Sequence, residues 1–383
     1  MDYPVISLFS GAMGLDLGLE AAGLDVRVSQ DYDPWCVHTM EANGRNHIPG
    51  DIRALVDDDP DCKGILKAAG LKRGEAFAVA GGPPCQSFST AGKRLSVQDP
   101  RGSLFMQFAH VVGKVRPRFF VMENVKGLVS ASIVHRPLDA RQGNPTPDET
   151  PGSVFKVVLE TLHGLGYTTE FAVLDAVHYG VPQFRERLVI VGSRDGEEIL
   201  MPQPTHFPRH QDAEFRWRTL RDAIGDLKGP RGACGSFSED RLVFLRKLSE
   251  GQNWKSLSIE DQRVAMGGAF ESGGGKMGFY RRLLWDEPAP TLVTSPVQKS
   301  TMLCHPTEDR PLSVREYARL QQFPDSWSIN GGAQHAYRQI GNAVPVGLGR
   351  AIGLSLVATA DGEGLRTYRR LRGTSVHNNL GKP

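Results

Sequence analysis

Residues 5–16 read Val5-Ile6-Ser7-Leu8-Phe9-Ser10-Gly11-Ala12-Met13-Gly14-Leu15-Asp16, and this stretch indicates the class of fold. The apolar run Val5–Phe9 has the length of a buried strand, and glycines follow it where a helical pattern begins. Glycine at such a turn lets the backbone approach a ligand closely. The stretch therefore predicts a first strand, a glycine turn and a first helix, the opening unit of an α/β domain.

The same alternation continues to about residue 195. Segments such as Leu104–Val115 and Val154–Leu165 carry apolar residues at helical spacing, and a proline-punctuated stretch at 137–151 reads as a long surface loop. The candidate strands are Val5–Phe9, Val26–Val28, Phe77–Ala80, Phe119–Met122, Phe171–Leu174 and Leu188–Val191. Strands that alternate with helices predict a doubly wound, mostly parallel α/β sheet.

A second, differently built region is expected after residue 195, where prolines, scattered aromatics and the glycine run Gly273–Gly275 break the rhythm. An apolar helical pattern returns at Val346–Ala358, which predicts that the chain packs back on the first domain. We therefore expect a first domain at 1–195, a smaller domain with a hinge at 196–335, a return segment at 336–365 and a basic tail at 366–383.

Charge and hydropathy limit the kinds of partner. Lys and Arg number 45 against 43 Asp and Glu, a net charge of +2, so any nucleic-acid surface must be confined to one side of the protein. No segment has the uninterrupted apolar length of a membrane span, and the N-terminus lacks the pattern of a signal peptide. These features predict a cytoplasmic protein with no membrane partner.

The five cysteines show no Cys-x-x-Cys spacing, so neither a disulfide framework nor a cysteine zinc site is favoured. His206 and His210 are separated by Pro208, which breaks the helix that would align them as metal ligands. We therefore predict no metal. Four of the cysteines are expected to be small buried core residues: Cys36, Cys62, Cys234 and Cys304.

A cofactor site is one reading of the first two strands. The glycine turn at Gly11 is followed by Asp31, at the end of the second predicted strand, and a carboxylate there can accept hydrogen bonds from both ribose hydroxyls of a nucleoside. A plain structural turn explains the same residues about equally well, because the loop lacks a complete Gly-x-Gly-x-x-Gly pattern.

Three segments carry residue types that suit covalent catalysis. Gly81-Gly82-Pro83-Pro84-Cys85-Gln86-Ser87-Phe88-Ser89 contains a cysteine, and Phe120-Val121-Met122-Glu123-Asn124-Val125 ends an apolar strand on a carboxylate. Val181-Pro182-Gln183-Phe184-Arg185-Glu186-Arg187-Leu188 adds two guanidinium groups. Read singly, these residues could be a core thiol, a helix-capping acid and surface cations. Together they indicate a nucleophile, a proton donor and a cationic stabiliser.

In this order and wording, the three segments resemble the bacterial DNA cytosine 5-methyltransferases. The resemblance covers residues 4–193 and resumes at 310–355, through Arg310–Asp325 and Gln339–Pro345. It implies a class I S-adenosylmethionine-dependent methyltransferase with a Rossmann-like sheet and a second, target-recognition domain. The intervening segment, 196–309, is where such enzymes differ by DNA target.

The resemblance also implies roles in the reaction. Cys85 would attack carbon-6 of cytosine, Glu123 would protonate or hydrogen-bond ring nitrogen-3, and Arg187 would donate to oxygen-2 while Arg185 fixes the local geometry. The cofactor would be S-adenosylmethionine. Its pocket would contain Phe9, Gly11, Ala12, Gly14, Leu15, Asp31, Tyr32, Asp51, Ile52, Pro84, Leu104 and Asn342. Asp31 departs from the Glu that is usual in the family at the ribose position.

The implied partner is double-stranded DNA with the target cytosine flipped out of the helix, because a base inside a duplex cannot reach a buried cysteine. A cognate restriction endonuclease could share the DNA target, and the protein is expected to act as a monomer. Rival readings are a tRNA cytosine 5-methyltransferase and a non-catalytic DNA-binding regulator. A nicotinamide dehydrogenase would leave the Pro-Pro-Cys-Gln segment unexplained.

Overall fold

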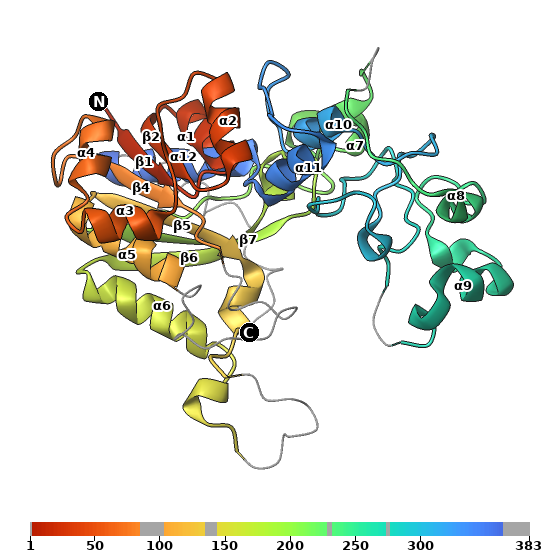
Figure 1. Ribbon diagram of the computed structural model, residues 1–383, viewed down its shortest axis with the longest axis horizontal. Coiled ribbons are helices and arrows are strands. Elements are labelled where there is room, and N and C mark those ends of the chain that lie inside the picture. Colours follow the sequence, from red (N-terminus) through yellow and green to blue (C-terminus); the bar gives the residue numbers. More distant parts are fainter. Residues whose placement is uncertain (1, 85–102, 135–143, 228–231, 273–275, 363–383) are drawn as a thin grey trace.

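The computed structural model describes residues 2–84, 103–134, 144–227, 232–272 and 276–362, and within these ranges seven strands form one sheet in the order β3-β2-β1-β4-β5-β7-β6 (Figure 1). Pairs from β3 through β5 are parallel, whereas β7 runs antiparallel to both β5 and β6. The strands are β1 Pro4–Leu8, β2 Asp25–Asp31, β3 His47–Pro49, β4 Ala78–Gly81, β5 Phe119–Val125, β6 Thr168–Asp175 and β7 Glu186–Ser193. The predicted mostly parallel sheet is confirmed.

Helices cover both faces of the sheet because alternate strand residues point to opposite sides. Val5 of β1 belongs to one hydrophobic core with Leu19 and Ile352, whereas its neighbour Ile6 belongs to the other with Phe108. The first core is covered by α1 (Gly14–Ala21) and α12 (Val346–Asp361). The second is covered by α3 (Ile52–Asp58), α4 (Lys63–Ala69), α5 (Ser103–Val115) and α6 (Ser153–Gly164), while α2 (Pro34–Ala42) follows β2.

Helix α12 packs closely against α1. A Cβ atom on Gly18 would lie 2.5 Å from the carbonyl oxygen of Val346, and one on Gly349 would lie 2.9 Å from that of Leu15. Glycine at both positions therefore allows the two helix backbones to touch. This contact attaches the end of the described chain to its beginning.

The residues between β7 and α12 lie beside the sheet and its helices (Figure 1). Their helices are α7 Leu220–Ile224, α8 Glu239–Leu245, α9 Ile259–Met266, α10 Val314–Leu320 and α11 Ala333–Asn342. Short 3-10 turns occur before β7 at Lys126–Ser130, Pro147–Glu149 and Ala176–Tyr179. After β7 they occur at Ala213–Phe215, Trp254–Ser256, Gly267–Ala269 and Lys299–Thr301. One hydrophobic cluster around Phe237, Trp254 and Tyr280 belongs wholly to this region. A second, around Leu292 and Tyr317, also includes Ala12 of the first domain.

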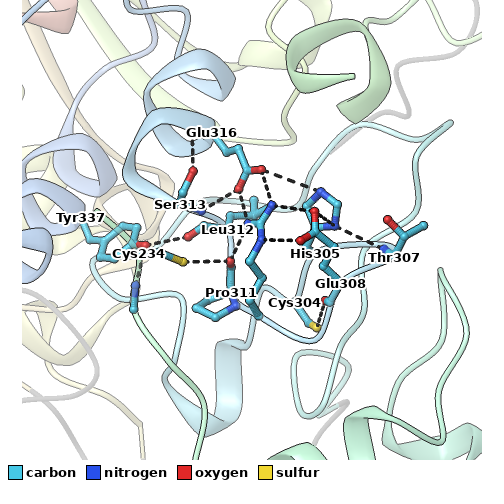
Figure 2. Close-up of polar contacts among 12 residues, drawn as sticks. Cys234, Cys304, His305, Thr307, Glu308, Pro311, Leu312, Ser313, Glu316 and Tyr337 are labelled. Atoms are coloured by element: carbon cyan, nitrogen blue, oxygen red, sulfur yellow. Dashed lines mark hydrogen bonds and ion pairs between the residues drawn. The ribbon is translucent and has the colours of Figure 1, made fainter. Parts of the chain in front are cut away.

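Figure 2 shows a polar network in this region that includes Glu308, Ser313, Glu316 and Tyr337. Arg310 donates to Glu316 at 2.7 and 2.8 Å and to Glu308 at 3.2 Å. Burial opposes the charge of Arg310, but these carboxylates outweigh it and raise the pKa of the guanidinium. Tyr337 of α11 donates to the Leu312 carbonyl at 2.7 Å, so the network connects α10 with the helix that leads back to the sheet.

Two details differ from the sequence expectations. The short strand β3 was not predicted, because three residues are too few to show a period. Cys36, Cys62 and Cys304 are buried as expected, but the prediction for Cys234 is wrong, because that residue is exposed. Part of the expected loop at 137–151 lies outside the described residues.

Two expected absences concern a metal and a membrane. No group of His, Cys, Asp or Glu side chains with metal-binding geometry occurs among the described residues. One helical stretch in the described chain, Ala333–Asp361, is long and apolar enough to cross a membrane. It comprises α11 and α12, which Pro345 separates, and 56% of its most apolar window is buried. Its contacts with α1 account for its apolar character.

Candidate active site

A cavity of about 550 Å³ opens where the parallel strands end. Ligands of open α/β sheets bind at this edge. The ends of β1, β2, β4 and β5, the start of β7 and the end of α11 all contribute to its walls. Among the residues predicted from the sequence, those that line it are Phe9, Gly11, Leu15, Asp31, Tyr32, Pro84, Glu123, Arg185, Arg187 and Asn342.

Asp31 is held rigidly at one end of the cavity. Its carboxylate accepts hydrogen bonds from the backbone amides of Gly11 at 2.8 Å and Asp33 at 2.9 Å. Burial raises the pKa of Asp31, and these amide donors oppose the rise. Gly11 has a φ of +56°, and a Cβ atom added to it would meet nothing within 4 Å, so its turn leaves open space beside the carboxylate. The two amides fix the orientation of Asp31 while leaving lone pairs for a ligand.

Five of the twelve residues expected around the cofactor are not among the cavity-lining residues: Ala12, Gly14, Asp51, Ile52 and Leu104. Asp51 instead caps α3 by accepting from the Arg53 amide at 2.9 Å, and hydrogen bonds from the Arg53 side chain lower its pKa. Gly14 permits close packing, since a Cβ there would lie 2.1 Å from the Val344 carbonyl oxygen. Ala12, Ile52 and Leu104 belong to or pack against hydrophobic cores.

Glu123 and Arg187 meet at the other end of the cavity. The Arg187 Nε lies 2.7 Å from the Glu123 Oε1, and their side chains are only 13% and 11% exposed. Antiparallel pairing of β5 with β7 brings them together, because Val125 lies opposite Arg187 in the register. A partly buried ion pair that borders a cavity can interact with a ligand on both a carboxylate and a guanidinium.

The backbone that leads toward Cys85 is fixed beside this pair. Asn124 donates from its side-chain amide to the Pro83 carbonyl at 3.0 Å, and a Cβ on Gly82 would lie 2.9 Å from Glu123 Oε2. Glycine at position 82 therefore lets the chain pass close to the carboxylate. Cys85 itself lies outside the described residues.

Arg185 differs from its neighbour Arg187, because its hydrogen bonds connect segments of the protein. It is 1% exposed and donates to the Leu292 carbonyl at 3.1 Å and the Gly341 carbonyl at 2.9 Å. Its Nε finds no acceptor among the described residues. Burial, with a smaller contribution from Arg187, lowers the pKa of Arg185 well below its usual value. These bonds tie β7 to the 196–309 segment and to α11.

Sequence reasoning missed several polar residues that line the cavity. Asp33 accepts from Arg338 of α11 at 2.7 Å, which closes one side between β2 and the returning chain. Asp16 is completely buried in the first turn of α1 and accepts from Ser7 at 2.6 Å and Ser29 at 2.8 Å. The available signal for Asp16 was an acid placed between Leu15 and Leu17 in the first turn of the predicted helix.

Comparison with known proteins adds a family to this geometry. A family model described as C-5 cytosine-specific DNA methylase matches residues 3–358. The type II methyltransferase M.Sau96I of Staphylococcus aureus is 37% identical over 358 residues, which cover 93% of this chain and 76% of that protein. The type II methyltransferase M.Eco47II of Escherichia coli is 37% identical over 371 residues, which cover 94% and 80%.

Solved structures share the fold at lower identity. A structure described as a DNA modification methyltransferase encoded within an Escherichia coli prophage has a TM-score of 0.62 at 23% identity, covering 94% of this chain and 100% of its own. The DNMT2 protein of Spodoptera frugiperda has a TM-score of 0.58 at 15% identity, covering 93% and 100%. At these identities, the likeness supports the architecture described above.

Proposed function

Because the chain belongs to the family of C-5 cytosine-specific DNA methylases, we propose that it methylates carbon-5 of a flipped cytosine in a specific double-stranded DNA sequence, with S-adenosylmethionine as cofactor and Cys85 as nucleophile. The observation that carries this proposal is a single cavity with two chemically different ends. Asp31 lies at one end, and the Glu123–Arg187 pair lies at the other. One end suits a nucleoside cofactor, and the other suits a polar base.

The residues of the cavity fit the proposed cofactor. Asp31 has its carboxylate oriented by two backbone amides, and the left-handed turn at Gly11 leaves room beside it. Phe9, Leu15 and Tyr32 supply apolar surface next to this carboxylate. When bound, S-adenosylmethionine supplies an electrophilic methyl group on a sulfonium centre. Asp31 would accept from the ribose hydroxyls, and the aromatic side chains would contact the adenine.

In the proposed reaction, the Cys85 thiolate forms a bond to carbon-6 of cytosine, and the electron pair of the carbon-5–carbon-6 double bond moves toward nitrogen-3. Arg187 donates a hydrogen bond to oxygen-2, and Glu123 delivers a proton to nitrogen-3, so that neither atom carries a bare negative charge. Carbon-5 then takes the methyl group. Water then accepts the carbon-5 proton, and the electron pair of that C–H bond forms the carbon-5–carbon-6 double bond as the sulfur–carbon-6 bond breaks. The proton on nitrogen-3 returns to Glu123, so the ring, the carboxylate and the Cys85 thiolate are restored.

This scheme requires the Glu123–Arg187 ion pair to open. Arg187 Nε lies against the Glu123 carboxylate, and in this contact Glu123 accepts rather than donates. A bound base places its nitrogen-3 and oxygen-2 between these groups, and Glu123 takes up a proton before donating. The pair therefore holds both side chains at the cavity until the substrate replaces their mutual contact.

Recognition of the DNA sequence is assigned to residues 196–309, which form most of the region beside the sheet (Figure 1). Its hydrogen-bonding side chains on loops can read base edges in the major groove. The type II names of the relatives support a restriction–modification role with an endonuclease partner. We expect the enzyme to act in the cytoplasm as a monomer.

Expression in a host without DNA methylation, followed by genome-wide mapping of 5-methylcytosine, tests the proposal directly. We expect 5-methylcytosine in one short sequence context, and none from a Cys85→Ala variant. A parallel assay on tRNA separates the two nucleic-acid substrates. Methylation of tRNA with unmodified DNA would overturn the DNA assignment, and cofactor-independent DNA binding without methylation would favour a regulator.

A further inference from the structure

Asp16 is a buried acid that the proposed reaction leaves without a role. It is 0% exposed, lies in the first turn of α1 and contributes to the wall of the cavity. Ser7 of β1 donates to one carboxylate oxygen at 2.6 Å, and Ser29 of β2 donates to the other at 2.8 Å. These hydroxyls hold the carboxylate in one orientation between two strands.

No Lys, Arg or His side chain forms an ion pair with Asp16 within the described ranges. Arg45 lowers the pKa of Asp16, but its guanidinium donates hydrogen bonds of 2.6 and 2.8 Å to Glu20. Burial of a carboxylate without a cation opposes folding, and two neutral hydroxyls offset only part of that cost. Such a group is expected where a ligand supplies the missing positive charge.

The order of the strands places Asp16 at a defined point along the cavity. Asp31 ends β2, and Ser7, which bonds Asp16, lies on the adjacent β1. Gly81 ends β4, and Glu123 lies near the end of β5. A cofactor with its ribose at Asp31 must direct its methyl group toward the base at Glu123. Its sulfur and amino acid portion would then lie near the ends of β1 and β4, the strands between β2 and β5, where Asp16 contributes to the cavity wall.

We propose that Asp16 is the anionic partner of the cationic methionyl portion of S-adenosylmethionine. This inference rests on the cofactor proposed above and adds a specificity-determining residue to it. Two cations could provide the charge, the α-ammonium group and the sulfonium. Ser7 and Ser29 act as positioning residues that fix the orientation of this carboxylate.

Calorimetric titration of the DNA-free protein with three ligands tests this role. S-Adenosylmethionine has both cations, S-adenosylhomocysteine keeps only the α-ammonium group, and 5′-methylthioadenosine has neither. We expect Asp16→Asn, which preserves shape, to weaken S-adenosylmethionine binding about tenfold to hundredfold, since a charge-assisted hydrogen bond is lost. Binding of 5′-methylthioadenosine is expected to change less than about twofold.

The result with S-adenosylhomocysteine shows which of the two cations interacts with Asp16. An equal loss for S-adenosylhomocysteine assigns Asp16 to the α-ammonium group, and a loss confined to S-adenosylmethionine assigns it to the sulfonium. Glu20→Gln is the matched control. It removes another carboxylate of helix α1, the one that pairs with Arg45. We expect it to leave the affinity for all three ligands unchanged.

Two results would contradict the inference and differ from failure of the proposed function. If wild-type protein binds S-adenosylmethionine and Asp16→Asn binds it equally well, Asp16 is not its counter-ion. The same conclusion follows if the affinity for all three ligands falls equally in Asp16→Asn. It also follows if this happens in a second variant, Asp16→Ser, that has the native circular dichroism spectrum. If wild-type protein binds none of the ligands, the cofactor proposal fails first.

Discussion

The Nε atom of Arg187 lies 2.7 Å from Oε1 of Glu123, and this contact joins the end of β5 to the start of β7 inside the cavity. Both side chains are more than four-fifths buried. The pair is thus protected from solvent screening, and its strength depends on the surrounding protein. The pair places a guanidinium and a carboxyl group side by side at the cavity wall.

Glu123→Gln and Arg187→Ala are each expected to slow methyl transfer by about 10²–10³, because each residue stabilises charge that develops on the ring. DNA affinity should change far less, since these interactions strengthen mainly in the transition state. Single-turnover rates and DNA binding curves measure the two effects separately. Glu186→Gln, an exposed acid paired with Lys126, serves as control and should retain the wild-type rate.

Cys85→Ala is expected to abolish methyl transfer with little effect on cofactor affinity, because the thiolate forms the covalent bond to the base. A duplex with 5-fluorocytosine at the target should trap the wild-type enzyme, since the fluorine cannot leave as a proton does. Denaturing gel electrophoresis detects the adduct. Cys234→Ser, a change at an exposed thiol, should form the adduct normally. Substantial turnover by Cys85→Ala would refute the mechanism.

Asp31→Ala is expected to raise the KM for S-adenosylmethionine about tenfold or more, because a charged acceptor is lost and the Gly11 and Asp33 amides lose their partner. The rate at saturating cofactor should fall much less. Steady-state kinetics at fixed DNA concentration distinguishes the two. Asp25→Asn, at the opposite end of β2 and paired with Arg27, is the control. An unchanged KM for Asp31→Ala would show that the ribose binds at another part of the protein.

Asp16 should make the stability of the ligand-free protein depend on pH. Burial raises its pKa from 3.8 to about 6, against the Ser7 and Ser29 hydrogen bonds, with Glu20 raising it and Arg45 lowering it slightly. The folded state therefore binds this proton more tightly than the unfolded state. Its stabilising contribution is complete below pH 3.8 and is lost as pH rises through about 6. The loss amounts to about 3 kcal/mol at neutral pH.

Urea unfolding of wild-type protein and Asp16→Asn between pH 4 and 7.5 measures this contribution. The free energy of unfolding of the wild type should fall relative to the variant as pH increases, because Asn cannot ionise. Other acids, such as Asp31, cancel in the comparison. A constant difference across this range would show that Asp16 does not titrate between its folded and unfolded states.

Exchange of residues 196–309 tests the proposal that this segment recognises the DNA sequence. Replacement of residues 196–309 by the matching segment of a relative such as M.Sau96I should change the methylated sequence to that of the donor. The graft should keep Thr291 and Leu292, which hydrogen-bond Phe184, Gln183 and Arg185. Bisulfite sequencing of host DNA gives the answer. An active chimera that keeps the original target would place recognition in the sheet domain.

The sequence by itself determined the α/β architecture and the chemical types of the residues proposed to react. Apolar runs such as Phe119–Met122 alternate with helical patterns, and local period alone separates strands from helices. The glycine turn at Gly11 and the acid at Asp31 were also visible, because both follow directly from a strand end. The motif around Cys85 carried the family resemblance.

Only the tertiary structure decided which of these residues share a cavity. Strand order and the antiparallel course of β7 bring Arg187 to Glu123, and no local pattern encodes contacts between strands distant in sequence. The same structure turns Asp51 toward Arg53, gives Arg185 a bridging role, and buries Asp16 against Ser7 and Ser29. A side chain's partners depend on packing in three dimensions, and sequence periodicity reports only the face on which it lies.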